Sequence, residues 1–170
     1  MSNEGVRRCR SRALPWGNRM NKLLVARCLF TINAAGIAVG GFIADWNASH
    51  VFNPRWPPHA KFHDGQTLAI GVLLAAVTLF FAWRRSGDRQ TNIVAATLTG
   101  GVLYWAQAGA FAVPGVAWTD PEFLKPGQSL HGFAPQIYFE MLGTFVIGLA
   151  SWLAWPPKAQ AHLSPASRSE

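Results

Sequence analysis

Four long apolar stretches constrain this chain more than any other feature of its sequence. They run from about 23 to 44, 66 to 83, 93 to 113 and 133 to 155, and each approaches the ~20 residues that a helix needs to cross ~30 Å of hydrocarbon. Half of the 170 residues are hydrophobic and only 14% are charged, against about a quarter in average soluble proteins. The sequence therefore predicts an all-α, multi-pass integral membrane protein folded as a four-helix bundle.

Basic residues are concentrated on one side of this predicted bundle. Arginine and lysine crowd residues 1–22, before the first stretch, and the short turn 84–90 after the second. Cytoplasmic segments of membrane proteins carry such an excess of positive charge. We therefore expect a basic cytoplasmic segment 1–22, a transmembrane domain 23–155, a polar cytoplasmic tail 156–170, and both termini on the same side. This distribution accounts for the net charge of +7, so the charge does not indicate a nucleic-acid-binding protein. No nucleic-acid recognition motif is present in the sequence.

The loop between the first two apolar stretches carries the greatest density of reactive side chains. Residues 45–67 hold three of the five histidines, with two aspartates, two tryptophans and three prolines. Proline is tolerated in the first turn of a helix, so the second helix has an alternative early start at Pro58. From that start, His59 and His63 would lie one turn apart on the same face. His50 is expected to face solvent.

Polar side chains within the apolar stretches are costly in hydrocarbon, and each calls for a partner or a role. Glu140 lies about two turns into the fourth stretch, and Gln136 shares its helix face. Tyr104 and Gln107 form a polar stripe in the outer half of the third stretch, and Asn33 lies deep in the first. We expect these groups to face the interior, and we expect Tyr104, Gln107 and Glu140 to form the floor of a pocket beneath the loop.

The first interpretation of this pocket is acid–base chemistry on a lipophilic small molecule near the outer leaflet, such as an isomerisation or cyclisation. Burial raises the pKa of a glutamate, and histidine titrates near neutral pH, so Glu140 would be the acid and His63 the base. The candidate catalytic residues are Glu140, His63, Asp45 and Tyr104. The candidate ligand-binding residues are Gln107, His59, Asp64, Trp56, Gln136 and Asn33.

Two alternatives remain open at this stage. In one, the HxxxH spacing of His59 and His63, together with Asp64, holds a metal ion. In the other, these residues are structural: Asp64 caps the second helix, Glu140 pairs with Tyr104 or Arg55, and the protein is a non-enzymatic accessory or lipid-binding subunit. Its partners would be membrane lipid, further copies of the chain or a larger membrane complex. The sequence identifies no cofactor.

Small residues at helical spacing occur in two of the stretches. Gly36 and Gly40 form a GxxxG pair in the first, and Thr97 and Gly101 form a similar pair in the third. Such positions let helix backbones approach closely. We expect these residues to pack inside the bundle, with dimerisation as the alternative.

The loop also carries a resemblance, in its segments ADWN, HVFNP and WPPHAKFHDGQT between Ala44 and Thr67. It resembles a family of small four-span membrane proteins of unknown function, some of which carry an acetyltransferase label. The likeness implies the four-span fold and no mechanism, and the chain has no acyl-CoA or nucleophile motif that would match the label. In layout alone, the chain is similar to the sterol-isomerase and sigma-2-receptor superfamily, whose helical bundles line a lipophilic pocket with acidic residues. That likeness implies recognition of a substrate cation by Glu140 and Asp45.

Overall fold

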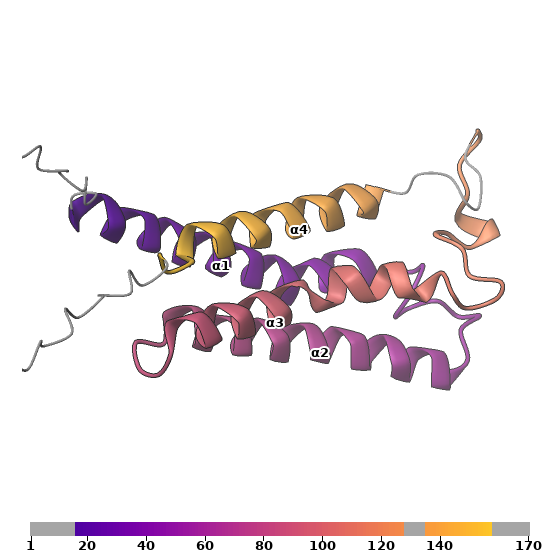
Figure 1. Ribbon diagram of the computed structural model, residues 1–170. Coiled ribbons are helices and arrows are strands. Elements are labelled where there is room, and N and C mark those ends of the chain that lie inside the picture. The colour runs from indigo at the N-terminus through magenta and orange to yellow at the C-terminus, as the bar shows by residue number, and fades with distance from the viewer. Residues whose placement is uncertain (1–15, 128–134, 158–170) are drawn as a thin grey trace, which may run out of the picture.

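The computed structural model describes residues 16–127 and 135–157, and these residues form four long helices (Figure 1). The segment before residue 16 and most of the tail lie outside the described residues. No β-strand occurs in the described ranges, which confirms the predicted all-α four-helix bundle. The helices are α1 (Trp16–Asp45), α2 (Pro58–Trp83), α3 (Arg89–Ala110) and α4 (Pro135–Ala154), with a short 3-10 helix, η1 (Pro121–Phe123), before α4.

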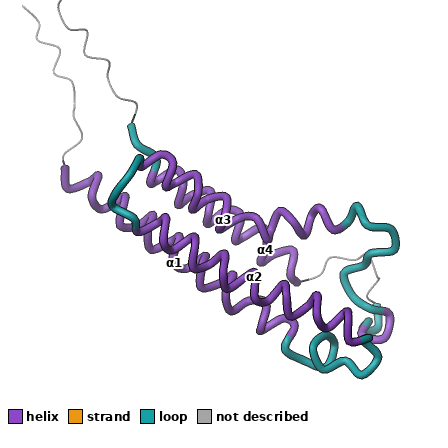
Figure 2. Tube along the Cα trace, turned by 90° about the horizontal axis from the view of Figure 1, so that it is seen from below, coloured by secondary structure: helices purple, strands orange, loops and turns teal. Residues whose placement is uncertain are grey.

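The four helices are arranged so that α2 and α4 occupy opposite corners. α1 packs against α2 and α4, α3 packs against the same two helices, and α1 also touches α3 across the centre, whereas no contact joins the described residues of α2 and α4. The start of α1 and the end of α4 lie at the same end, which we call the arginine end after the turn 84–88 (Figure 2). The segments 46–57 and 111–127 lie at the other end, called the loop end.

Three helices are long and apolar enough to cross a membrane: Met20–Asp45, Pro58–Trp83 and Gln136–Ala154. Their surfaces expose large apolar side chains, such as Ile43 at 78% and Trp152 at 70%, as expected for contact with lipid. α3 has 22 residues, but threonines, Tyr104 and Gln107 interrupt its apolar residues. A fourth span at 93–113 therefore stays a prediction.

The helix boundaries follow local sequence signals. α2 begins at Pro58, as the alternative early start predicts, because proline needs no backbone hydrogen-bond partner in the first turn. α3 begins four residues before the predicted span, because the Asp88 side chain caps it by accepting a hydrogen bond from the Thr91 backbone N–H at 2.6 Å.

Gly71 and Gly100 allow neighbouring helices to pack closely, whereas the glycines of the predicted GxxxG pair do not contribute to this packing. A Cβ atom at Gly100 would lie 2.6 Å from Ile147 Cδ1, and one at Gly71 would lie 3.1 Å from the Ile37 carbonyl oxygen. Gly36 and Gly40 are exposed, and a Cβ atom at either would meet nothing within 4 Å. The prediction that this pair packs inside the bundle is wrong, because it lies on the outward face of α1.

α3 makes polar contacts with every other helix of the bundle. It makes a side-chain hydrogen bond to each of the other three helices at successive levels along its length. These bonds join Thr97 Oγ1 to Ser151 Oγ of α4 at 2.6 Å, Thr99 Oγ1 to Thr78 Oγ1 of α2 at 2.9 Å, and the Tyr104 hydroxyl to Asn33 Oδ1 of α1 at 3.3 Å.

Candidate functional site

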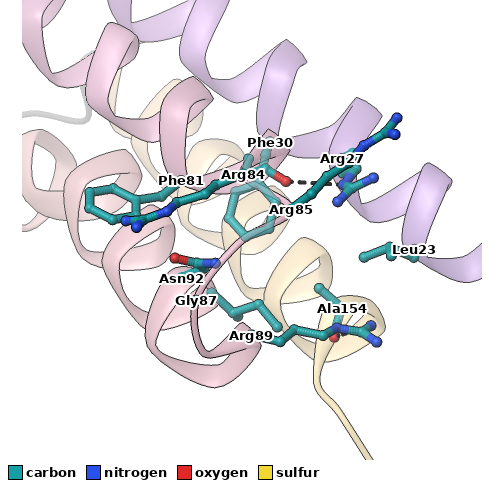
Figure 3. Close-up of a pocket in the computed structure, with 12 residues that line it drawn as sticks. Leu23, Arg27, Phe30, Phe81, Arg84, Arg85, Gly87, Arg89, Asn92 and Ala154 are labelled. Atoms are coloured by element: carbon teal, nitrogen blue, oxygen red, sulfur yellow. Dashed lines mark hydrogen bonds between the residues drawn. The ribbon is translucent and has the colours of Figure 1, made fainter.

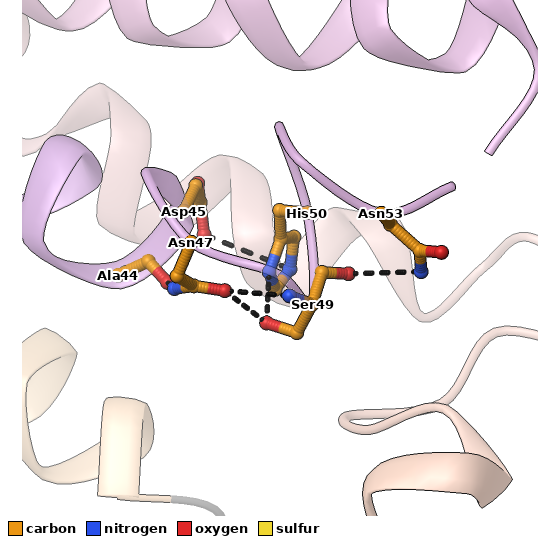
Figure 4. Close-up of polar contacts among 6 residues, drawn as sticks. All are labelled: Ala44, Asp45, Asn47, Ser49, His50 and Asn53. Carbon is orange, nitrogen blue, oxygen red and sulfur yellow. Dashed lines mark hydrogen bonds and ion pairs between the residues drawn. The ribbon is translucent and has the colours of Figure 1, made fainter. Parts of the chain in front are cut away.

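The segment after α1 folds back on the end of that helix at the loop end (Figure 4). The backbone N–H groups of Asn47 and Val51 donate to the Asp45 carbonyl oxygen at 2.8 and 3.1 Å. The Asn47 side chain accepts from the Ser49 backbone N–H at 2.8 Å, a local turn that asparagine commonly forms. These bonds place the following residue, His50, beside the carboxylate of Asp45.

Both ring nitrogens of His50 are held in place. Nε2 lies 3.6 Å from Asp45 Oδ1, and Nδ1 lies 2.8 Å from Ser49 Oγ. The ring also meets Trp56 edge-on, with 5.2 Å between the ring centroids. The sequence led us to expect a solvent-facing His50; its side chain is 39% exposed, and the structure also places it against a carboxylate, a hydroxyl and an indole. The turn-forming Asn47 and Ser49 were the sequence signal for this position.

Asp64 completes a cluster with these two residues. It lies in the second turn of α2 and is close enough to both Asp45 and His50 to interact with them electrostatically. Its Oδ2 atom is buried and has no hydrogen-bond partner among the described residues. We call Asp45, His50 and Asp64 the Asp–His–Asp cluster.

The structural role predicted for Asp64 is wrong. Pro57 is the N-cap residue of α2 and provides no side-chain hydrogen bond, so Asp64 lies seven residues inside the helix and caps nothing. A buried carboxylate oxygen without a donor costs free energy unless a proton, a water molecule or a ligand satisfies it. Among the described residues, Oδ2 of the half-buried Asp64 is therefore a buried side-chain oxygen whose hydrogen bonding is incomplete.

The predicted histidine pair on α2 is present, on an exposed face. His59 and His63 lie one turn apart, with 3.0 Å between their Nε2 atoms and 4.5 Å between ring centroids. The other nitrogen of His63 lies 3.4 Å from Gln66 Oε1. In the ranges that the structure describes, no three His, Cys, Asp or Glu side chains are grouped so that they could hold a metal ion. The metal interpretation thus has two adjacent ligands and lacks a third.

The polar residues predicted to lie inside the bundle form two separate pairs there, Asn33 with Tyr104 and Gln107 with Glu140. Asn33 is buried, donates to the Gly100 carbonyl oxygen at 2.8 Å and accepts from Tyr104. One turn closer to the loop end, the Gln107 amide nitrogen, turned toward α4, donates to both carboxylate oxygens of Glu140. Gln136, on the same helix as Glu140, is exposed.

The single pocket predicted from the sequence is therefore divided. Asn33 lies 12 residues before Asp45 on α1, which corresponds to about 18 Å along a helix. His63 and Glu140 are not brought together, because they lie on α2 and α4, which occupy opposite corners. Glu140 also does not pair with Tyr104 or Arg55. It is bound by Gln107, and Arg55 forms an ion pair with Glu122.

That ion pair belongs to a group of contacts among Asn53, Arg55 and Glu122, which we call the loop-end clasp. The Glu122 side chain on η1 also accepts a hydrogen bond from the Nδ2 atom of buried Asn53 at 3.2 Å. The side-chain oxygen Oδ1 of Asn53 in turn accepts a hydrogen bond from the Arg55 backbone N–H at 2.9 Å. Residues from the two long connections are thus bound to each other beside the Asp–His–Asp cluster.

Comparison with known proteins places most of the chain in one family. Residues 29–151 match a family described as "Family of unknown function (DUF6640)". No curated protein and no solved structure matches the chain. The resemblances to an acetyltransferase-labelled family and to the sterol-isomerase superfamily stay predictions, because the matched family carries no activity.

Proposed function

The chain belongs to this family of unknown function, and we propose that it binds a lipophilic small molecule at the loop end, where the Asp–His–Asp cluster exchanges a proton with it. The ligand class is a lipid-like molecule that carries a hydroxyl or amine group. The proposal moves the proton-exchanging role from Glu140 to Asp64.

One observation carries the proposal: the buried, unpartnered Oδ2 atom of Asp64. Glu140 and Asn33 have hydrogen-bond donors or acceptors within the protein, so their polar groups are satisfied without a ligand. Asp64 Oδ2 lacks such a partner among the described residues. An ionisable residue in a membrane span is a functional-site hypothesis by default, and here the missing partner would be the O–H or N–H group of the ligand.

The neighbours of Asp64 suit proton exchange. Asp45 and Ser49 fix the ring of His50 by one contact at each nitrogen, and an imidazole can serve as a proton donor or acceptor. With two carboxylates and one imidazole so close, the cluster can hold a variable number of protons. Asp64 would give or receive the proton, and His50 would adjust the charge around it, as an isomerisation or cyclisation of a lipophilic molecule requires.

The test compares molecules that copurify with the full-length protein and with two variants. Asp64→Asn keeps the shape of the side chain and removes its charge. Asp120→Asn makes the same chemical change at an exposed aspartate of the loop end and serves as the control. Organic extracts of the three purified proteins are compared by mass spectrometry.

We expect one lipophilic compound to copurify with the wild-type protein and with Asp120→Asn. In Asp64→Asn its occupancy should fall about 10- to 100-fold, because hydrogen bonds to charged groups contribute about 1.5–3 kcal/mol. Equal occupancy in all three proteins would mean that Asp64 does not bind the ligand.

A further inference from the structure

A pocket of about 260 Å³ lies at the arginine end, opposite the Asp–His–Asp cluster (Figure 3). Its floor is apolar and includes Phe30 of α1 and Phe81 of α2. Two helices and one turn supply its basic residues. These are Arg27 of α1, Arg84 and Arg85 of the turn after α2, and Arg89 of α3.

The positive charge of this pocket is not neutralised within the described part of the chain. No aspartate or glutamate lines the pocket, and none of its arginines forms an ion pair with another described residue. Burial, together with the nearby positive charge of Arg27, lowers the pKa of the Arg89 guanidinium. Positive charge is therefore concentrated in a partly desolvated place where an anion would be favoured.

Hydrogen bonds hold two of these arginines in position. Arg27 Nε donates to the Ala82 carbonyl oxygen at 3.1 Å, and Arg89 Nη2 donates to the Ala154 carbonyl oxygen at 2.6 Å. Both acceptors lie in the last turn of a helix, where backbone carbonyls lack helical partners. Each guanidinium has five N–H groups, so several donors remain for a ligand. Arg27 and Arg89 lie on the same side of the pocket, while Arg84 extends to the other (Figure 3).

Orientation in the membrane does not explain this arrangement. The positive-inside bias needs positive charge near the ends of the spans, but it does not require arginines from three segments to surround an apolar floor. The planar fork of arginine matches the oxygens of a phosphate group.

We propose that this pocket binds the phosphate group of an anionic phospholipid, with the apolar floor against its glycerol and first acyl carbons. Basic pockets between transmembrane helices are suited to anionic headgroups. Free phosphate shares the same chemistry, so the experiment distinguishes the two sources. The site is independent of the ligand proposed at the loop end.

The test measures the melting temperature of the full-length protein in detergent micelles during titration with phosphatidylglycerol, phosphatidylcholine or inorganic phosphate. Arg85→Gln is the main variant, because Arg85 lines the pocket and makes no hydrogen bond, ion pair or ring contact with another described residue. Arg89→Gln is the second variant. Arg55→Gln loses the same charge at the loop end and is the matched control.

We expect phosphatidylglycerol to raise the melting temperature more than phosphatidylcholine. Arg85→Gln and Arg89→Gln should bind it about 10- to 100-fold more weakly, and Arg55→Gln should bind it as the wild type does. If inorganic phosphate alone gives the same variant-sensitive response, the phosphate site is supported and its ligand is soluble. Equal responses to the two lipids, or wild-type affinity in Arg85→Gln, would overturn the proposal. If Arg89→Gln does not fold, Arg85→Gln decides alone.

Discussion

The hydrogen bond between Tyr104 and Asn33 gives a stability prediction that a double-mutant cycle can test. Tyr104→Phe removes the hydroxyl that donates to Asn33 Oδ1 and leaves the ring in its place against Gly143. Asn33→Ala removes the acceptor of that bond and also the donor to the Gly100 carbonyl oxygen. The cycle isolates the one contact that the two side chains share.

The expected magnitude follows from the geometry and the surroundings of this bond. Side-chain hydrogen bonds between membrane helices contribute about 0.6 kcal/mol on average and about 1.7 kcal/mol at most. The distance of 3.3 Å exceeds the range of about 2.5–3.0 Å typical of O–H···O bonds, so we expect a coupling of about 0.6 kcal/mol. Asn33→Ala should cost about 2–3 kcal/mol in total, because it also loses the second bond and leaves a cavity.

The assay is unfolding of the full-length protein in detergent micelles, followed by far-ultraviolet circular dichroism. Tyr138→Phe is the control, because Tyr138 is 66% exposed and makes no hydrogen bond with another described residue. The double variant should be less destabilised than the sum of the single variants. Strict additivity, or an equal cost for Tyr138→Phe, would refute the conclusion that this bond stabilises the bundle.

Three further predictions concern packing, a helix cap and the loop-end clasp. Gly100→Ala should lower the free energy of unfolding by about 1–3 kcal/mol, because the added methyl group overpacks the helix contact. Gly36→Ala should not lower it, because alanine has the higher helix propensity and this face of α1 is open. Denaturant titration measures the free energy of unfolding of both variants. Hydrogen bonds from Thr91 lower the pKa of the Asp88 carboxyl, so the contribution of this cap to stability is present above the unfolded pKa of about 3.9 and is lost as pH falls through the lower folded value. The difference in melting temperature between the wild type and Asp88→Ala should therefore disappear below about pH 4. A difference that stays constant with pH would contradict the cap. Arg55→Ala should cost only about 0–1 kcal/mol but increase amide exchange in residues 46–57; unchanged exchange would show that the clasp does not order this segment.

Local signals in the sequence predicted the helices well. The second helix begins at the proline that permits an early start, and each predicted apolar stretch contains most of the residues of one observed helix or lies within it. The polar stripes of the third and fourth helices also meet, at Gln107 and Glu140. These features depend on residues within one or two turns of each other, or on the general cost of polar groups in hydrocarbon.

The order of helices around the bundle could not be predicted in this way. This order places His63 and Glu140 on helices at opposite corners and turns Gly36 and Gly40 outward. A helical face is defined by the sequence, but its direction depends on which neighbours surround the helix. The return of the segment 46–57 onto Asp45 was also missed, because it depends on several short turns acting together, and with it the contacts of His50 were missed.

The bonds of α3 to all three neighbours have a consequence for the biogenesis of the protein. α1, α2 and α4 are long and apolar enough to cross a membrane, whereas Thr97, Thr99 and Tyr104 of α3 each bond to a side chain of one of those helices. The partner of Thr97 is on α4, which is synthesised last. If α3 is the predicted fourth span, its stable integration should depend on the segment that follows it. A ribosome-bound chain that ends before residue 135 should then hold α3 less firmly in the bilayer than the full 170-residue chain does.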